Sequence, residues 1–445
     1  MARAPGATSR GGGRWGGPDA ARARLVDALR DGGRLTDPAV EAAFRAVPRH
    51  VFLPTMAAAD AYQDEAFVVK TGPDGLPLSS SSQPAIMAIM LEQLGVAPGY
   101  RVLEIGTGTG YNAALIAHLV GERGTVVTVD IDADLVAKAR ANLDGAGYPD
   151  VIVICGDGGF GAPGHAPYDR IIVTAGAWDL APAWLDQLGH GGRIVLPLSV
   201  RGIQLSIALE REAGYWRSRS AFRCGFIRMA GAFAGPESFL PLGPQPGLHV
   251  HTDDGRPVDA GALYAALSSP ATDVPSGVAV AGLGEMGEAD LWLTVTQPDL
   301  VRLTITGGGP LRGTVLPLVP LGAMSDSATV ADDGPAGDLG VAALLPARAP
   351  NRGGPGYGGF EVAVRGFGSR GPGLAGRLAG QVVAWDGLDR PGTSDLSLRA
   401  YPLDTPADAL PGQVILDRRY TRLVLSWPPR RPSAPGRLTG RGLDH

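Results

Sequence analysis

The sequence predicts an α/β protein built on a doubly wound, mostly parallel β-sheet and followed by a smaller α+β domain. Short apolar runs rich in β-branched residues recur along the first half of the chain, and helical patterns separate most of them. Strands that alternate with helices connect through right-handed crossovers into a parallel sheet. A glycine-rich turn follows the first of these runs, and the composition shifts toward Gly, Pro and Ala after Gly235-Pro236.

The length of the chain sets its domain organisation. At 445 residues it is too long for one ordinary core, so we expect two domains with tails. The boundary is expected between 236 and 248, where prolines crowd together. We expect a disordered tail over 1–18, a catalytic domain over 19–238, a C-terminal α+β domain over 248–430 and a flexible tail over 431–445.

Composition excludes several classes of partner. The formal net charge is −5 and no segment is strongly basic, which argues against nucleic acid. No apolar run is long enough to span a membrane and no secretory signal precedes the domains, so we expect a cytoplasmic protein without a membrane partner. Two cysteines cannot form a disulfide framework, and neither they nor the histidines suggest a metal site. The oligomeric state is not predicted.

The elements of the first domain follow from local patterns. A helix is expected over 21–29, and Asp37 followed by Pro38 caps a second helix that runs through Phe44. The expected buried strands are 101–105, 125–130, 151–154, 169–174 and 193–197, with helices over 85–94, 112–120 and 133–143. The runs 203–210 and 214–222 flank a Gly-containing turn, which predicts a closing antiparallel hairpin. This arrangement is a Rossmann-like sheet.

The second domain is expected to hold an antiparallel sheet. The runs 291–296 and 301–306 alternate between apolar and polar residues around a Gln-Pro-Asp turn, which predicts a hairpin. Further strands are expected over 360–364, 396–401 and 421–427, and a helix over 371–386. The domain could offer a sheet edge to an extended peptide. A role in dimerisation or in other protein contacts is equally open.

The strongest chemical signal is the turn Glu104-Ile-Gly-Thr-Gly-Thr-Gly-Tyr111 after the first strand. Glycines let the backbone turn sharply and approach a ligand closely. Asp130 follows by about 20 residues at the end of the second strand, where a carboxylate can hold ribose hydroxyls. A dinucleotide motif needs a glycine at position 111, which is Tyr111 here. The spacing therefore favours S-adenosylmethionine (SAM) over NAD. Asp157-Gly158, after the third strand, could accept a hydrogen bond from adenine, although alone it is an ordinary turn.

The methyl acceptor is expected to be a carboxylate. The fourth strand ends in Thr174-Ala-Gly-Ala177, without the polar clamp typical of enzymes that methylate amines. A carboxylate is ionised at neutral pH and needs no general base. Upstream, Ser79 to Ser82 run into Gln83, Pro84 and a helix, and hydroxyls at a helix N-terminus can form an anion site. A simple helix cap in a flexible loop explains the same serines equally well.

Several stretches together resemble the protein-L-isoaspartate (D-aspartate) O-methyltransferase family. They cover residues 20–200 in the family's order and comprise 47–54, 61–64, 82–84, 102–111, 156–158, 168–175 and 191–197. The resemblance implies esterification of an aspartyl-type carboxylate, followed by succinimide formation and hydrolysis to Asp or isoAsp. It implies a catalytic hydroxyl at Ser82 and a substrate site at Ser80, Ser81, Ser82 and Gln83. It also implies a SAM site at Glu104, Gly106, Thr107, Gly108, Gly110, Tyr111, Asn112, Asp130, Ile131, Asp157 and Gly158.

The chain also departs from the family pattern. The segment Lys70 to Ser79 lengthens the approach to Ser82, and the chain continues far beyond the closing strands where repair enzymes end. Both departures resemble an actinobacterial subgroup associated with maturation of ribosomally made peptides such as lanthipeptides and graspetides. We therefore expect a protein or a modified precursor peptide as partner, and we favour the precursor peptide over general repair of damaged proteins. A catalytically silent SAM- or peptide-binding protein and a tRNA base methyltransferase are the alternatives of other classes.

Overall fold

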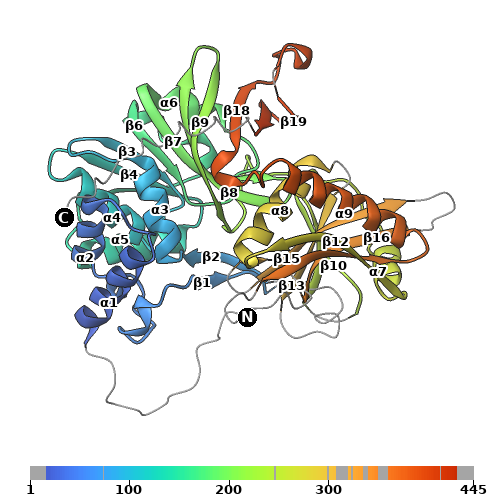
Figure 1. The fold of residues 1–445 in the computed structure, drawn as a ribbon. Helices are drawn as coiled ribbons and strands as arrows, with labels where there is room; N and C mark the ends of the chain where they lie inside the picture. The colour runs from blue at the N-terminus through green and yellow to red at the C-terminus, as the bar shows by residue number, and fades with distance from the viewer. Residues whose placement is uncertain are drawn as a thin grey trace, which may run out of the picture.

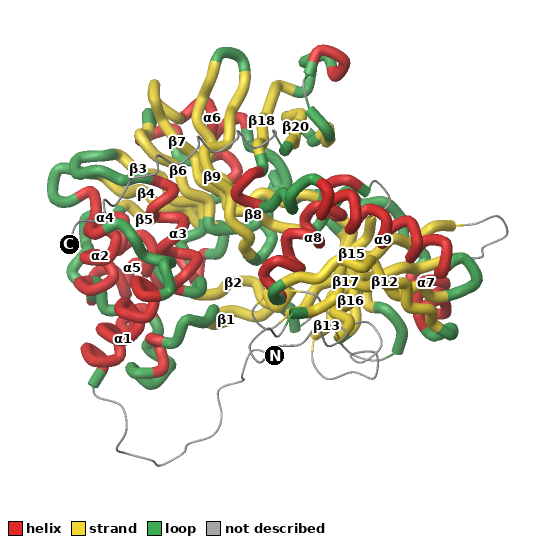
Figure 2. Tube along the Cα trace, viewed as in Figure 1, coloured by secondary structure: helices red, strands yellow, loops and turns green. Residues whose placement is uncertain are grey.

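The computed structural model describes residues 17–73, 75–244, 247–297, 300–306, 319–321, 324–333, 339–348, 359–410 and 412–427. Apart from Gly17 and Pro18, the tails expected over 1–18 and 431–445 lie outside these residues. Two large β-sheets organise the described part of the chain, with helices on the faces of both, and β1 (Phe67–Thr71) and β2 (Pro77–Ser81) form a separate two-stranded sheet (Figures 1 and 2).

The first sheet is the doubly wound sheet that the sequence predicts. Its strands lie in the order β19-β20-β18-β9-β8-β7-β6-β3-β4-β5. The parallel strands are β3 (Arg101–Ile105), β4 (Thr125–Asp130), β5 (Ile152–Cys155), β6 (Tyr168–Val173) and the first part of β7 (Leu188–Val200). The predicted hairpin is β8 (Ile203–Glu212) with β9 (Tyr215–Cys224), antiparallel to each other and to β7.

Both faces of this sheet are buried at its central parallel strands, which explains why β3 and β4 are nearly continuous apolar runs. Alternate residues face opposite sides: Val102 and Val126 pack with the N-terminal helices, whereas Leu103 and Val127 belong to a core on the other face. The helices of the first face are α1 (Pro18–Asp31), α2 (Pro38–Ala46), α3 (Pro84–Leu94), α4 (Tyr111–Val120) and α5 (Ala133–Gly145). Asp37 caps α2, as predicted, by accepting hydrogen bonds from the N–H groups of Ala39 and Val40.

The core of the second face is shared with the C-terminal half. It contains Trp184 of α6 (Pro182–Gln187) together with apolar residues of α8 (Leu283–Thr296) and α9 (Gly371–Gly387). The sheet of the first half and the helices of the second therefore enclose one continuous apolar cluster.

The second sheet is antiparallel. Its strands lie in the order β10-β11-β13-β15-β16-β17-β12, and β14 pairs with β15. They are β10 (Ser238–Pro241), β11 (Leu248–Thr252), β12 (Ala271–Val280), β13 (Leu300–Thr306), β14 (Val319–Leu321), β15 (Met324–Asp333), β16 (Leu339–Arg348) and β17 (Phe360–Phe367). Helix α7 (Ala260–Leu267) packs on one face with Val341 and Ala343, and α8 and α9 pack on the other with Ala342 and Leu344. None of the described helices is long and apolar enough to cross a lipid bilayer.

The hairpin predicted from 291–296 and 301–306 is wrong in its first strand. Residues 291–296 are the end of α8, and β13 pairs with β11 and β15 instead. Helix α8 is buried on every side from Met286 to Val295, so no apolar stripe marks it in the sequence. The β-branched residues at its end then give a strand-like alternation. The helix predicted over 371–386 is confirmed as α9.

The last strands return to the first sheet. Strand β18 (Ser397–Pro402) pairs with β9 and with β20 (Thr421–Ser426), and β20 pairs with β19 (Val414–Asp417). The strands that we expected in a separate domain over 248–430 thus divide between two sheets. A division of the chain between 238 and 248 remains a proposal, and the topology adds 397–426 to the catalytic sheet.

Candidate active site

The glycine turn lies between β3 and α4 with its glycines in left-handed conformations. The φ angles of Gly106, Gly108 and Gly110 are 100°, 52° and 87°. A Cβ on Gly106 would lie 2.6 Å from the Thr174 hydroxyl oxygen at the end of β6. Conformation and packing both require glycine at this position. The turn therefore brings the backbone of 106–108 close to the carboxyl ends of β4 and β6.

Glu104 supports the turn from below. Its carboxylate is completely buried and accepts hydrogen bonds from Asn112 Nδ2 and Thr128 Oγ1, both at 2.7 Å. Burial raises the pKa of this carboxyl to about 7. The Thr107 and Thr128 hydroxyls are also 2.7 Å apart. Glu104 thus ties β3, β4 and α4 together beneath the turn and does not line the cavity described next.

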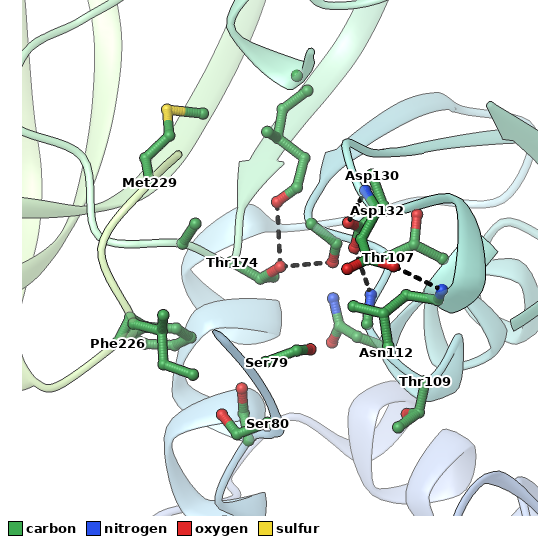
Figure 3. A pocket seen from close by; sticks show the side chains of 18 of the residues that line it. Ser79, Ser80, Thr107, Thr109, Asn112, Asp130, Asp132, Thr174, Phe226 and Met229 are labelled. Atoms are coloured by element: carbon green, nitrogen blue, oxygen red, sulfur yellow. Dashed lines mark hydrogen bonds between the residues drawn. The ribbon is translucent and has the colours of Figure 1, made fainter. Parts of the chain in front are cut away.

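A cavity of about 280 Å³ opens at the carboxyl ends of β3, β4 and β6. This is where ligands bind in open α/β sheets. In Figure 3, Phe226 and Met229 lie on the wall across from Asp130 and Asp132, with Ser79 and Ser80 between them. Of the predicted site residues, the cavity is lined by Ser80, Ser81, Ser82, Gly106, Thr107, Gly108, Tyr111, Asn112, Asp130, Ile131 and Gly158. The predicted residues outside this lining are Gln83, Glu104, Gly110 and Asp157.

The acidic residues after β4 are held by backbone groups. Asp130 accepts hydrogen bonds from Gly108 N at 2.9 Å and Asp132 N at 3.1 Å. Asp132 caps α5 and accepts a bond from Lys70 Nζ at 2.5 Å, which joins the hairpin β1 (Phe67–Thr71) and β2 (Pro77–Ser81) to this edge. Ile131 is about half exposed beside them. The arrangement suits a ligand with a polar ribose, which the carboxylates could face, next to an apolar ring surface, which Ile131 could contact.

Asp157 does not line the cavity. Its carboxylate accepts hydrogen bonds from Gly159 N at 2.9 Å and from Ala232 N at 2.7 Å. Gly158 lines the cavity, and a Cβ there would lie 2.5 Å from Ile105 Cγ2. Asp157 therefore joins the turn after β5 to the loop after β9, and its proposed contact with adenine remains a prediction.

The serine segment lies on the hairpin and not in a flexible loop. Ser79, Ser80 and Ser81 belong to β2, and Ser82 follows directly before α3. Arg49, which is fully buried, donates from Nη2 to the Ser82 carbonyl oxygen at 2.8 Å and to Ser81 Oγ at 3.3 Å. Burial lowers the pKa of Arg49 to about 10, so it is still charged at neutral pH. The role of Arg49 in supporting this segment cannot be seen in the sequence, because its contacts with Ser81 and Ser82 form only in the folded chain.

The N-terminus of α3 is already partly occupied. Asp64 accepts hydrogen bonds from Ala85 N at 2.8 Å and from Gln83 Nε2 at 3.1 Å. The carboxylate of Asp64 thus caps the helix end that we expected to bind a substrate anion. Gln83 faces Asp64, whereas the hydroxyl-bearing segment Ser80–Ser82 faces the cavity.

Sequence reasoning missed the far wall of the cavity. Residues 226–230 follow β9 and line the cavity together with Thr174 and Ala175. This wall is fixed by backbone hydrogen bonds from Gly176 N to Ile227 O at 2.8 Å and from Met229 N to Gly176 O at 2.9 Å. No local motif marks 226–230. Arg228, whose Nη1 donates to Glu237 O at 3.0 Å, is the cation among the described lining residues.

This chain is similar to known protein-L-isoaspartate O-methyltransferases. The family model described as protein-L-isoaspartate(D-aspartate) O-methyltransferase matches residues 20–233. A protein-L-isoaspartate O-methyltransferase of Methanopyrus kandleri is 40% identical over 222 residues, which is 49% of this chain and 96% of that protein. One of Methanoregula boonei is 40% identical over 212 residues, or 48% of this chain and 94% of that protein. A solved structure of a protein-L-isoaspartate O-methyltransferase has a TM-score of 0.46 and 23% identity over 85% of this chain and 96% of that chain.

The relatives are matched almost from end to end by one half of this chain, at identities well above those of chance similarity. The glycine turn, the cavity beside it and the serine segment all lie within the matched residues. The chain belongs to the protein-L-isoaspartate(D-aspartate) O-methyltransferase family, and it is an enzyme that uses SAM as its cofactor.

Proposed function

We propose that this chain transfers a methyl group from SAM to an aspartyl or isoaspartyl carboxylate of a protein or peptide. The observation that carries the proposal is that Ser79–Ser82 and the glycine turn line one cavity. The names of the relatives, which are protein-L-isoaspartate O-methyltransferases, support the same acceptor.

The chemistry of the cavity suits an acceptor that arrives ionised. SAM supplies a methyl group on a positively charged sulfur, and a carboxylate is the nucleophile at neutral pH without a base. Among the described lining residues there is no His, Cys or Lys, and the two carboxylates, Asp130 and Asp132, are engaged by N–H groups and Lys70. The chain is therefore left to bind and align the two reactants, and alignment alone can supply a large part of the rate enhancement.

In this proposal, different walls of the cavity bind the two reactants. Ser82, with its carbonyl oxygen held by buried Arg49, presents its hydroxyl to the acceptor carboxylate. The glycine turn and Asp130 hold the cofactor. In the ester product, attack by the adjacent backbone nitrogen expels methanol and gives a succinimide, whose hydrolysis yields Asp or isoAsp.

The acceptor could be any damaged protein or one dedicated peptide. The relatives support general repair as the function, because the matched half of this chain covers nearly the whole length of each relative. A ribosomally made precursor peptide is the second candidate. The observation that favours it is the remaining half of this chain, which lies outside those two sequence matches.

Two peptides of equal length separate these readings. One carries isoAsp in a plain linear sequence, and the other carries Asp within a constrained macrocycle. Methyl transfer from labelled SAM to the linear isoAsp peptide, with later return to Asp, is the expected result for repair. Transfer only to the constrained peptide, followed by loss of water, would identify a tailoring enzyme. Transfer to neither would refute the proposed acceptor.

The role of Ser82 has its own test. We expect Ser82→Ala to keep SAM affinity and to lose turnover. Ser79→Ala, which removes a neighbouring hydroxyl of the same wall, is the matched control and should retain turnover. Unchanged turnover in Ser82→Ala would refute the assigned role.

A further inference from the structure

The end of the extension is built into the methyltransferase sheet. Strand β18 pairs with β9 through Arg399 with Arg217 and Ala400 with Trp216, and Leu398 N donates to Ser218 Oγ at 2.9 Å. In Figure 1 the last strands lie beside β9, at the end of the first sheet. The segment between β19 and β20, residues 418–420, is thereby brought to the catalytic half.

The first residue of this turn is an anchor. Arg418 is buried, and its Nη2 donates to Ser199 O at 3.0 Å and to Asp253 Oδ2 at 3.1 Å. Its guanidinium lies 4.5 Å from the centre of the Trp178 ring. Asp179 accepts hydrogen bonds from Tyr420 N at 2.6 Å and from the Thr421 hydroxyl. The turn is therefore fixed to the loop that follows β6.

The next two residues contact the loop that follows β9. Arg419 donates from Nη1 to Ala232 O at 2.9 Å and from Nη2 to Ala234 O at 3.3 Å. The Tyr420 ring centre lies 5.6 Å from that of Phe233, which in turn lies 5.3 Å from that of Phe160. The Arg419 guanidinium thus holds both ends of the segment 232–234, and the Tyr420 ring contacts its middle residue.

This loop leads directly to the cofactor cavity. Residues 226–230 line the cavity, and Ala232 N donates to Asp157 Oδ2 at 2.7 Å. Gly231 has a φ of 88°, and a Cβ there would lie 2.4 Å from Asp157 Oδ2. The loop and Asp157 are packed so tightly that a shift of one must move the other, together with Gly158 in the cavity wall.

We propose that Arg419 and Tyr420 are positioning residues for the SAM site. They fix residues 231–234, and through them Asp157, Gly158 and the wall 226–230. They lie beyond residues 20–233, the part matched by the family model, so residues outside that match complete the cofactor site of this chain. The inference depends on SAM binding and not on the proposed acceptor.

The test uses the full-length chain and S-adenosylhomocysteine as the probe, measured by isothermal titration calorimetry. Arg419→Ala is expected to weaken binding about tenfold, a size reached by single contacts that couple through a neighbouring element. Arg419→Lys, which can satisfy one of the two carbonyl oxygens, should recover part of the loss. Tyr420→Ala should weaken binding in the same direction.

Arg422→Ala is the matched control. Arg422 lies three residues from Arg419 and donates to Asp417 at 2.6 and 2.8 Å, so the variant loses a comparable set of bonds without touching 231–234. Hydrogen exchange of a peptide covering 226–234 should become faster in Arg419→Ala and stay unchanged in Arg422→Ala. Binding at the wild-type level in Arg419→Ala, or an equal loss in Arg422→Ala, would overturn the proposal. Because no acceptor is present, failure of the proposed acceptor cannot affect either outcome.

Discussion

The guanidinium of Arg49 donates a 2.8 Å hydrogen bond to the backbone carbonyl oxygen of Ser82 from a position with no solvent exposure. The same side chain donates to the carbonyl oxygens of Gln63 and Glu65 at 3.2 and 3.3 Å. One buried cation thereby joins the segment before β1 to the segment after β2. The hydroxyls that face the cavity are held by a charge that does not itself line it.

Removal of this cation should damage both stability and turnover. Arg49→Ala leaves several buried carbonyl oxygens unpaired, so we expect a loss of about 3 kcal/mol in the free energy of unfolding. Urea unfolding measures this loss. Arg49→Lys keeps the charge but not the fork of donors, and we expect it to fold with a reduced kcat. A wild-type kcat in Arg49→Lys would show that the position of Ser82 does not depend on the fork.

Glu104 predicts a pH dependence of stability. Burial raises its pKa to about 7 in the folded chain from 4.5, so the folded state binds more protons than the unfolded state between these values. The contribution of Glu104 to stability therefore falls as the pH rises from 4.5 to 7, by up to about 3 kcal/mol.

The matched variant is Glu104→Gln. The difference in unfolding free energy between wild type and variant, measured by urea unfolding at several pH values, should change across this window and stay level above it. A constant difference would mean that the carboxyl is not protonated in the fold.

Gly106 predicts a loss of cofactor binding when a side chain is added. Gly106→Ala combines a φ of 100° with a Cβ 2.6 Å from the Thr174 hydroxyl, so the turn must move away from β6. We expect SAM affinity to fall at least about tenfold. Gly99→Ala is a control for the backbone strain alone, because its φ is 86° and no atom lies within 4 Å of its Cβ. Equal affinities in the two variants would show that the packing of Gly106 is irrelevant.

The sequence predicts the elements that have a local cause. The strands 101–105 and 125–130 are apolar runs buried on two faces, and Asp37 marks the start of α2 by its own side chain. The glycine turn can be recognised in the sequence because its positive φ angles restrict three positions to glycine. These features depend on residues close to one another in the chain.

The rest depends on tertiary contacts between distant segments. Helix α8 has no stripe because apolar partners surround it, and Arg49 becomes a support only when the hairpin folds over it. The wall 226–230 is placed by bonds to Gly176, and β18 by pairing with β9. The spacing of these residues along the chain does not show which distant segment each one contacts, so periodicity could not predict these contacts.

Deletion of the extension predicts a failure of folding and not merely of recognition. A chain ending at residue 238 exposes the β9 edge that β18 covers and removes α8 and α9 from the core shared with the first sheet. It also removes Asp290, a fully buried carboxylate that pairs with Arg223 of β9 at 2.9 Å. Exposed apolar surface next to an open sheet edge favours aggregation. We expect the truncated chain to be insoluble or to lack a cooperative unfolding transition by circular dichroism.

A milder variant tests the same contact without deletion. Asp290→Asn keeps the shape of the side chain but leaves Arg223 and Arg302 buried without their counter-charge, since Arg302 also donates to Asp290 at 3.2 Å. We expect it to lower the free energy of unfolding by about 3 kcal/mol. Asp273→Asn, at an exposed pair with Arg365 in the same half, should cost less than about 1 kcal/mol. If residues 1–238 instead fold cooperatively and bind SAM as the full chain does, the two halves are independent and the extension has no structural role in the catalytic site.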